Sequence, residues 1–210
     1  LDFLHARTVA YSVAGEMEKL AKFTAEAQEN FKTSRSPDAR ARAALQAGVG
    51  LWIMRKYAEA CAALEAAAER PDGAFLVGLC KTELGACDEA VRCFDRAEKA
   101  GQDAFACAMA SAEALRRAGR IDDALAKVRA FQKSHDAEAE LHYQKGRCLI
   151  ARMDYELGTE ALERAVELNP QHLGALFHLG FWNDLRGNDG RRWIITRRPS
   201  PSSRRTGTPC

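Results

Sequence analysis

Apolar and polar residues alternate along most of this chain with the spacing of short amphipathic helices. In the segment 74–97, AFLVGLCKTELGACDEAVRCFDRA, apolar residues recur every three to four positions on both sides of Gly85. This spacing predicts two helices joined by a tight turn at that glycine. Segments 112–131 and 145–170 have the same layout. We therefore expect a series of helix pairs.

The residues around each expected turn support this prediction. Gly85 and Gly119 stand where a first helix must stop, a place that favours a residue with positive φ. Acidic pairs follow at Asp88–Glu89 and Asp122–Asp123. Negative charge is favourable in the first turn of a helix, because the helix dipole is positive there. Each acidic pair therefore indicates the start of a second helix.

A small residue recurs along the chain at a nearly constant interval. The members of this series are Gly48, Gly78, Ala112, Gly146 and Gly180. The first interval is 30 residues and the next three are 34 each, and a second series follows twelve residues later at Ala60, Ala90, Ala124 and Gly158. A period of this length indicates stacked supersecondary units. We expect the small residues to lie where two helices cross closely, with larger residues filling the remaining gap from the second helices, namely Phe94, Val128 and Leu162.

These features together resemble the tetratricopeptide repeat (TPR). Besides the period and the small residues, the resemblance rests on Tyr57 and Tyr155 at the start of second helices and on AVELNP at 165–170. It covers residues 39–187, as four repeats and the first helix of a fifth, although the first repeat is four residues short. The resemblance implies an all-α fold, a right-handed α-solenoid of stacked antiparallel helix pairs (a TPR superhelix).

The two ends of the chain depart from the repeat. Residues 1–36 have a helical pattern that does not follow the repeat register, and we interpret them as an N-terminal cap or a degenerate repeat. At the other end, residues 190–210 are rich in Arg, Ser and Pro and have no helical period, which predicts a disordered basic tail. One interpretation is an incomplete or frame-shifted stretch of a longer bacterial repeat protein. The other is a natural tail that contacts nucleic acid or an acidic partner.

The charge of the chain is distributed unevenly. The net charge is +2, but six arginines and no acidic residue follow Asp189. Without those arginines the chain has 25 basic and 29 acidic residues. The repeat body therefore gives no electrostatic reason to expect a nucleic acid partner, and only the tail does.

No catalytic, cofactor or metal-binding motif is recognisable in the sequence. The run GVG at 48–50 lacks the third glycine and the preceding strand of a dinucleotide-binding loop. The seven cysteines match no zinc or redox spacing, which favours buried, reduced thiols. His142 and His178 have no ligand partners at metal spacing and are interpreted as surface or groove residues. We expect a protein that is not an enzyme and binds no cofactor or metal.

The sequence also lacks membrane and export signals. No window approaches 18 consecutive apolar residues, and residues 1–20 carry charge in every turn, unlike a signal peptide. These observations predict a cytoplasmic protein.

In TPR proteins the first helices of successive repeats line a concave groove that binds a segment of a partner protein. By this resemblance the groove residues here are Leu45, Val49, Trp52, Phe75, Leu79, Met109, Glu113, Arg116, Tyr143, Arg147, Phe177, His178 and Phe181. Aromatic and arginine side chains are the types that dominate binding hot spots. The alternative for each aromatic residue is a place in the core between stacked repeats.

The expected partner is a protein or peptide with apolar side chains. One TPR subgroup binds a terminal carboxylate through Lys and Asn, but the matching positions here hold Leu45, Val49 and Leu76. Arg116, Arg117 and Arg147 would be available for an acidic flank. The sequence therefore predicts a protein–protein interaction scaffold. The alternatives are the repeat portion of a larger regulator or enzyme, because segment 176–189 also looks like a repeat from bacterial proteins with a downstream RNA polymerase α C-terminal-like domain, and nucleic-acid contact through the tail.

Overall fold

The computed structural model describes residues 16–185, which contain ten α-helices and no strand. The helices are α2 (Met17–Thr33), α3 (Pro37–Ile53), α4 (Tyr57–Leu64), α5 (Pro71–Glu83), α6 (Cys87–Lys99), α7 (Ala104–Arg117), α8 (Ile121–Phe131), α9 (Ala139–Ala151), α10 (Tyr155–Leu168) and α11 (Leu173–Leu185), and the short 3-10 helix η1 (Glu65–Ala67) follows α4. The chain divides into two compact units, 1–135 and 136–210. The first unit contains α2 to α8, and the second contains α9 to α11.

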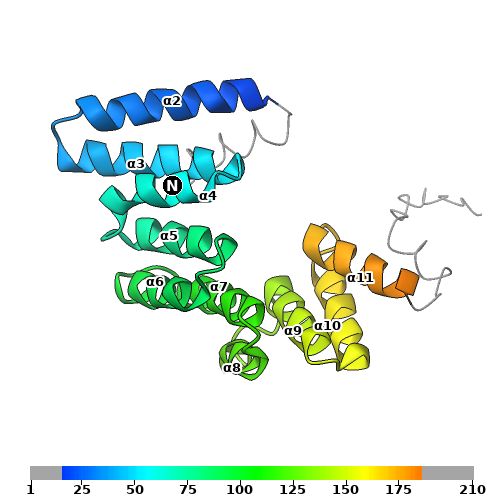
Figure 1. Ribbon diagram of the computed structural model, residues 1–210. Helices are drawn as coiled ribbons and strands as arrows, with labels where there is room; N and C mark the ends of the chain where they lie inside the picture. The colour runs from blue at the N-terminus through cyan, green and yellow to red at the C-terminus, as the bar shows by residue number, and fades with distance from the viewer. Residues whose placement is uncertain (1–15, 186–210) are drawn as a thin grey trace, which may run out of the picture. The chain divides into compact units, whose positions relative to one another are not determined.

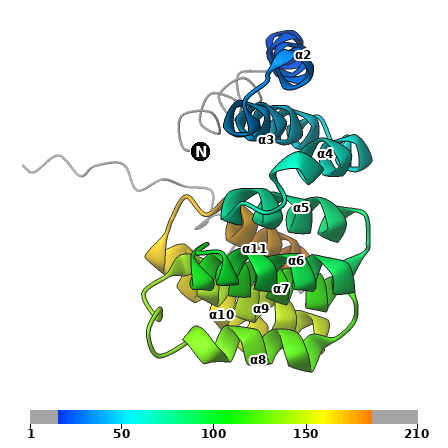
Figure 2. The same ribbon diagram turned by 90° about the vertical axis from the view of Figure 1, so that its left-hand side faces the viewer.

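The first unit is a stack of helix pairs. Helices α3 and α4, α5 and α6, and α7 and α8 form the pairs, and α4 and α6 also pack against the first helices of the next pairs, α5 and α7 (Figures 1 and 2). Short turns join the two helices of each pair at Arg55, Gly85 and Gly119, where φ is 62°, 79° and 78°. The prediction of positive φ at the two glycines is confirmed.

The second helices begin where the sequence predicts. Tyr57, Cys87, Ile121 and Tyr155 are their first residues, and acidic side chains lie in the first turn of each. Two first helices, α3 and α5, begin with a proline, whose fixed φ suits this position and whose missing N–H costs no helical hydrogen bond. Helix α7 instead has Asp103 as its cap, and the carboxylate accepts a 2.8 Å hydrogen bond from the N–H of Ala106.

The recurring small residues lie at close crossings between the helices of a pair. A Cβ added at Gly78 would lie 2.5 Å from Cε1 of Phe94, and one added at Gly146 would lie 2.8 Å from Cγ of Leu162. The same relation holds between Gly48 and the side chain of Leu64. The bulky residue thus occupies the space that the glycine leaves, which confirms the prediction for Phe94 and Leu162, and Leu64 does the same in the first repeat.

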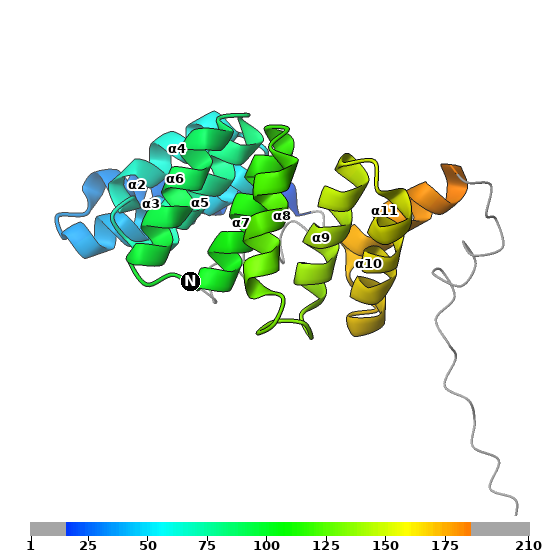
Figure 3. The ribbon, with the colours of Figure 1, turned by 90° about the horizontal axis from the view of Figure 1, so that it is seen from below.

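The second unit has the same construction. Helices α9 and α10 form an antiparallel pair whose turn includes Met153 at φ 70° (Figure 3). Helix α11 packs against α10, where Ala175 and Leu179 join an apolar cluster with Leu162 and Ala165. Helix α11 therefore starts a further repeat in the predicted register.

The N-terminal helix α2 packs against α3 through one apolar face. Leu20, Phe23 and Ala27 are buried there, and Thr24 lies against Gly50. Both a cap and the second helix of a degenerate repeat would pack in this way, so the two interpretations stay predictions. Residues 1–15 and the expected tail at 190–210 lie outside the described residues.

Two predictions about buried chemistry have different outcomes. None of the six cysteines of the described range forms a disulfide bond, and five of them are buried, with Cys61 partly exposed. His142, in contrast, was expected at the surface or in the groove, and this is wrong because its side chain is buried. Its Nε2 lies 2.8 Å from the carbonyl oxygen of Asp136. The residues at the same repeat position of α5 and α7, Ala74 and Ala108, are buried too. The burial of His142 could therefore have been predicted from its position in the repeat.

None of the helices in residues 16–185 is both long and apolar enough to cross a membrane.

Candidate functional site

The predicted groove residues fall on first helices of both units. Those on α3, α5 and α7 belong to the first unit, and those on α9 and α11 belong to the second. We therefore describe two surfaces separately.

Three of the candidates in the first unit are core residues. Leu45, Val49 and Met109 are only 5%, 4% and 3% exposed. Leu45 belongs to an apolar cluster formed with residues of α4 and α5. The prediction that these three side chains line an open groove is not met, because packing between helices encloses them. A partner could reach them only if the helices separated.

The apolar candidates that remain accessible in the first unit are half-buried. Trp52 lies edge-on to Tyr57, with ring centroids 6.4 Å apart, and Phe75 packs at 5.4 Å from Phe94. Leu79 packs against the same cluster as Phe75. The indole N–H of Trp52 is buried and has no hydrogen-bond partner within the described part of the chain. These side chains stabilise the helix pairs and expose only part of their surface.

The charged candidates of the first unit form an ion-pair network on α7. Arg116 donates two hydrogen bonds to Glu113, at 3.0 Å and 2.9 Å. Arg117 donates to the same carboxylate at 2.6 Å and to Glu83 of the preceding repeat at 2.9 Å. Burial alone would lower the pKa of Arg117, but the hydrogen bonds that it donates to Glu83 and Glu113 raise this pKa above its usual range. An acidic partner would have to compete with these carboxylates.

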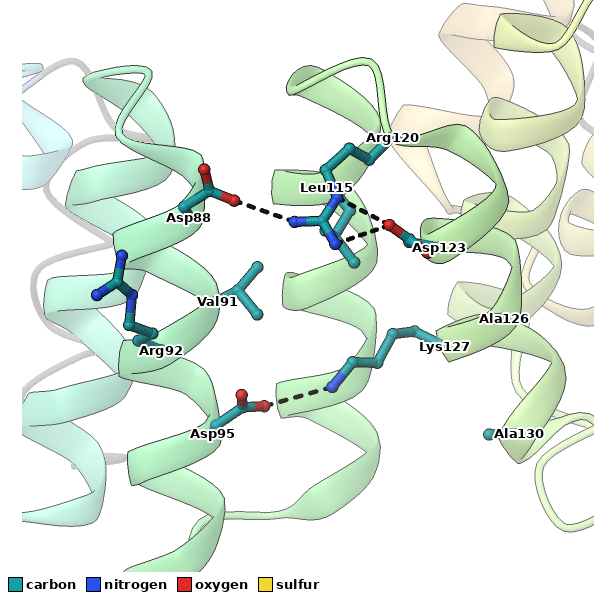
Figure 4. Close-up of a pocket in the computed structure, with 10 residues that line it drawn as sticks. All are labelled: Asp88, Val91, Arg92, Asp95, Leu115, Arg120, Asp123, Ala126, Lys127 and Ala130. Carbon is teal, nitrogen blue, oxygen red and sulfur yellow. Dashed lines mark hydrogen bonds and ion pairs between the residues drawn. The ribbon is translucent and has the colours of Figure 1, made fainter.

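A cleft on the second helices was not predicted from the sequence. It has a volume of about 640 Å³ and lies between α6, α7 and α8, with Val91, Leu115 and Ala126 among its apolar lining residues (Figure 4). Ion pairs cross its mouth, from Arg120 to Asp88 at 3.1 Å and from Lys127 to Asp95 at 3.3 Å. The lysine and the arginine are each 32 residues from their acidic partners, so these pairs join α8 and its preceding turn to α6 of the previous repeat.

In the second unit, predicted groove residues lie close to one another. The guanidinium carbon of Arg147 lies 5.3 Å from the ring centroid of Tyr143, a cation–π distance. The Tyr143 ring also lies 6.0 Å from His178 of α11. A Cβ added at Gly174 would lie 2.8 Å from Cζ of Tyr143, so the glycine allows the tyrosine to pack under the start of α11.

His172 holds the start of α11 and was not among the predicted residues. Its Nδ1 accepts a 3.0 Å hydrogen bond from the N–H of Ala175, which caps the helix. Its Nε2 lies 3.1 Å from the Glu140 carboxylate of α9, and its ring lies 4.6 Å from Tyr143. This residue therefore fixes the helix that presents His178 and its aromatic neighbours.

The most exposed apolar side chains of the candidate set are on α11. Phe177 is 70% exposed and Phe181, one turn later, is 52% exposed. Leu173, one turn before Phe177, is 81% exposed. Exposed apolar patches of this kind mark interaction sites more often than isolated apolar residues do. The second unit thus has an aromatic surface of Tyr143, Phe177 and Phe181, flanked by Arg147 and His178.

Metal chemistry finds no support in residues 16–182, where no group of three His, Cys, Asp or Glu side chains is placed to hold a metal ion.

Two solved structures are informative relatives in fold. MamA from Desulfovibrio magneticus RS-1 is 23% identical to this chain with a TM-score of 0.54, and the match covers 74% of this chain and 90% of MamA. YrrB, a TPR protein with an unusual peptide-binding site, is 21% identical with a TM-score of 0.54, over 83% of this chain and 89% of YrrB. The chain has the tetratricopeptide-repeat fold. The prediction of an all-α solenoid is thereby confirmed.

A third structure with this fold is a longer protein. PlcR from Bacillus thuringiensis, solved with the peptide PapR7 and DNA, is 13% identical with a TM-score of 0.55, over 94% of this chain and 74% of PlcR. No family model matches the sequence, and no curated protein matches it. The TPR fold of this chain thus rests on its three-dimensional arrangement and on its internal period.

Proposed function

We propose that this protein is a protein–protein interaction scaffold without catalytic activity, and that it binds a peptide segment through the first helices of its TPR repeats. The observation that carries the proposal is the aromatic surface on α9 and α11, where Phe177 and Phe181 are 70% and 52% exposed. Large apolar side chains with this exposure reduce solubility and are stabilised when a partner covers them. YrrB and PlcR, which share the fold, are described with a peptide-binding site and with a bound peptide.

The chemistry of the surface indicates the kind of peptide. Tyr143, Phe177 and Phe181 favour apolar or aromatic side chains, because aromatic contacts contribute most of the energy at hot spots. Arg147, held over the Tyr143 ring, favours an acidic residue beside them. Arg147 lies beside Tyr143 in the second unit, whereas Arg116 and Arg117 lie on α7 of the first unit, so the proposed acidic flank is placed at Arg147.

The proposed place of action is the cytoplasm. The six cysteines of the described range form no disulfide bond, and two of them, Cys80 and Cys148, are completely buried. Free buried thiols are typical of proteins that fold in a reducing compartment.

A selection of peptides by the intact protein tests the proposal. Random dodecamer peptides displayed on phage are selected against the full chain, and enriched sequences are synthesised for titration by fluorescence anisotropy. We expect enriched peptides with two apolar or aromatic residues next to an acidic residue. Phe177→Ala should weaken their binding by about 2 kcal/mol or more, as for a hot-spot anchor.

The matched control removes an exposed apolar side chain from the same unit. Leu157 on α10 is 55% exposed, and Leu157→Ala should leave peptide affinity unchanged. The proposal fails if no peptide is enriched, or if Phe177→Ala and Leu157→Ala weaken binding equally.

A further inference from the structure

A continuous chain of hydrogen bonds links α9 to the first turn of α11. The side-chain amide of Gln144 donates a 2.8 Å hydrogen bond to Oε1 of Glu140. Nε2 of His172 lies 3.1 Å from Oε2 of the same carboxylate, and Nδ1 of His172 accepts a 3.0 Å hydrogen bond from the N–H of Ala175. The His172 side chain therefore connects the two helices that carry the aromatic surface.

These contacts define the protonation state of the His172 ring. A ring nitrogen that accepts a hydrogen bond from an N–H group must carry a lone pair, so Nδ1 has no hydrogen. Nε2 faces a carboxylate oxygen, which can only accept when it is ionised, so Nε2 carries the hydrogen. The form of the ring that makes both contacts is the neutral Nε2–H tautomer.

Protonation of His172 is incompatible with one of these two contacts. Both ring nitrogens of an imidazolium are donors, so Nδ1–H would face the N–H of Ala175. A positive charge at the N-terminus of a helix is also unfavourable, because the helix dipole is positive there. The contact with Glu140 persists as an ion pair. The contact that protonation removes is therefore the cap of α11.

The helices of the second unit carry further ionisable groups close to His172 in space or in sequence, namely Glu140, Tyr143 and Arg147 of α9, Arg164 and Glu167 of α10, and His178 of α11. The Tyr143 ring lies 4.6 Å from the imidazole, with Arg147 at 5.3 Å and His178 at 6.0 Å from the same tyrosine ring. At the end of α10, Arg164 and Glu167 bind each other at 3.0 Å. Glu140 is thus the carboxylate that contacts the ring and keeps it attached to α9 in either charge state.

A histidine cap distinguishes α11 from the earlier first helices that the structure describes. Helix α7 is capped by the carboxylate of Asp103, and α3, α5 and α9 have no side-chain cap. Histidine is the side chain that ordinarily changes its charge between about pH 5 and about pH 8. Among these first helices, α11 is therefore the one whose start depends on a group that titrates near neutral pH.

We propose that His172 is a pH-sensitive cap that couples protonation to peptide binding at the aromatic surface, an inference that rests on the proposed function. At neutral pH the neutral ring holds the first turn of α11, where Gly174 packs against Tyr143. At acidic pH the protonated ring releases this turn, and the packing of α11 on Tyr143 loosens. Phe177 is then no longer held in a fixed place relative to Tyr143, so a peptide that contacts both rings binds more weakly.

Nuclear magnetic resonance of the full chain tests the cap without any peptide. Long-range proton–nitrogen spectra of the imidazole identify its tautomer, and the amide signal of Ala175 reports the hydrogen bond to the ring. We expect the Nε2–H tautomer of His172 at about pH 8. The amide signal of Ala175 should shift together with the titration of His172 between about pH 8 and about pH 5.5, and its protection from hydrogen exchange should fall over the same range.

Peptide affinity, measured by fluorescence anisotropy at the two pH values, tests the coupling to binding. The wild-type protein should bind a phage-selected peptide at least about fivefold more weakly at about pH 5.5 than at about pH 8, the size expected for the loss of an N-cap. His172→Asn supplies a favoured cap that does not titrate, so its affinity should be the same at both pH values. His178→Asn is the matched control, because it removes the other histidine near Tyr143 and should keep the pH response.

Three results would overturn the proposal. An Nδ1–H tautomer at high pH, or an Ala175 amide that does not follow the titration of His172, would show that the ring does not act as this cap. An equal pH response of peptide binding in the wild-type protein and in His172→Asn would show that His172 does not regulate binding. A phage selection that yields no peptide is a separate result, since it contradicts the proposed function, while the Ala175 amide still decides whether protonation releases α11.

Discussion

The ring of Phe94 occupies the space left by the missing side chain of Gly78. A Cβ at residue 78 would lie 2.5 Å from Cε1 and 2.8 Å from Cδ1 of this ring. Phe94 is completely buried and also packs against Phe75 on the same first helix. The pair therefore sets the distance between α5 and α6, because neither helix can approach further and neither can separate without a cavity.

This contact predicts a loss of stability when residue 78 becomes larger. Gly78→Leu should lower the free energy of unfolding by about 1–3 kcal/mol, because the added side chain overpacks the crossing. Urea denaturation followed by circular dichroism measures the change. Gly180→Leu is the matched control, since nothing described lies near that position, and it should cause no loss. Equal effects of the two substitutions would contradict the assignment of the contact.

The conformation of the turn between first and second helices predicts that two substitutions change stability in opposite directions. Gly119 and Met153 occupy the same repeat position with φ of 78° and 70°. A side chain in this left-handed region costs about 1–2 kcal/mol, so Gly119→Ala should destabilise the protein by that amount. Met153→Gly should stabilise the protein by a smaller amount. The relief of the strained φ is partly offset because glycine has more conformational entropy in the unfolded chain. Chemical denaturation of both variants tests the pair, and a stabilising Gly119→Ala would refute it.

The order of helices was predictable because the repeat signals are local and recur. Gly85, Gly119 and the acidic pairs after them act within one turn of the chain, so their effect can be read from adjacent residues. The shortening of the first repeat was also predictable from the sequence. In the structure its second helix, α4, has only eight residues and is followed by the 3-10 helix η1. Gly73 allows the start of α5 to lie close to η1, because a Cβ at this position would collide with the carbonyl of Ala67.

The candidate site was less predictable because it depends on contacts between distant residues. Leu45 and Val49 share a groove register with Phe75, yet packing of the helices encloses them. The aromatic surface depends on a hydrogen bond between His172 and Glu140, which are 32 residues apart. Neither burial by a neighbouring helix nor a side-chain contact of this range follows from a periodic pattern.

The buried thiols predict a loss of stability at alkaline pH. Burial raises the pKa of the Cys80 thiol from 9.0 to about 12. The folded state therefore keeps the proton at pH values where the unfolded state loses it, so stability is complete below about pH 9 and falls as pH rises towards 12. Urea midpoints measured across this range should fall, and the fall should be smaller in Cys80→Ala. An identical pH dependence in both proteins would show that Cys80 does not contribute.

Tyr143 and Phe177 should respond differently to truncation, although the sequence places them at the same position of successive repeats. Tyr143 packs against Gly174 and lies 4.6 Å from the His172 ring, so Tyr143→Ala removes contacts that hold α11 to α9. We expect a loss of about 3 kcal/mol or more in the free energy of unfolding, as for other large aromatic residues that pack between helices.

Phe177→Ala should instead change stability by no more than about 0.5 kcal/mol, because the side chain is 70% exposed and contributes little to packing. Phe177→Ala should instead weaken peptide binding. Tyr143→Ala should reduce both the free energy of unfolding and the affinity for the peptide. Denaturation and anisotropy measured on the same two variants separate these effects. A large loss of stability in Phe177→Ala would mean that this residue supports the fold, and the aromatic surface would then lose its main anchor for a partner.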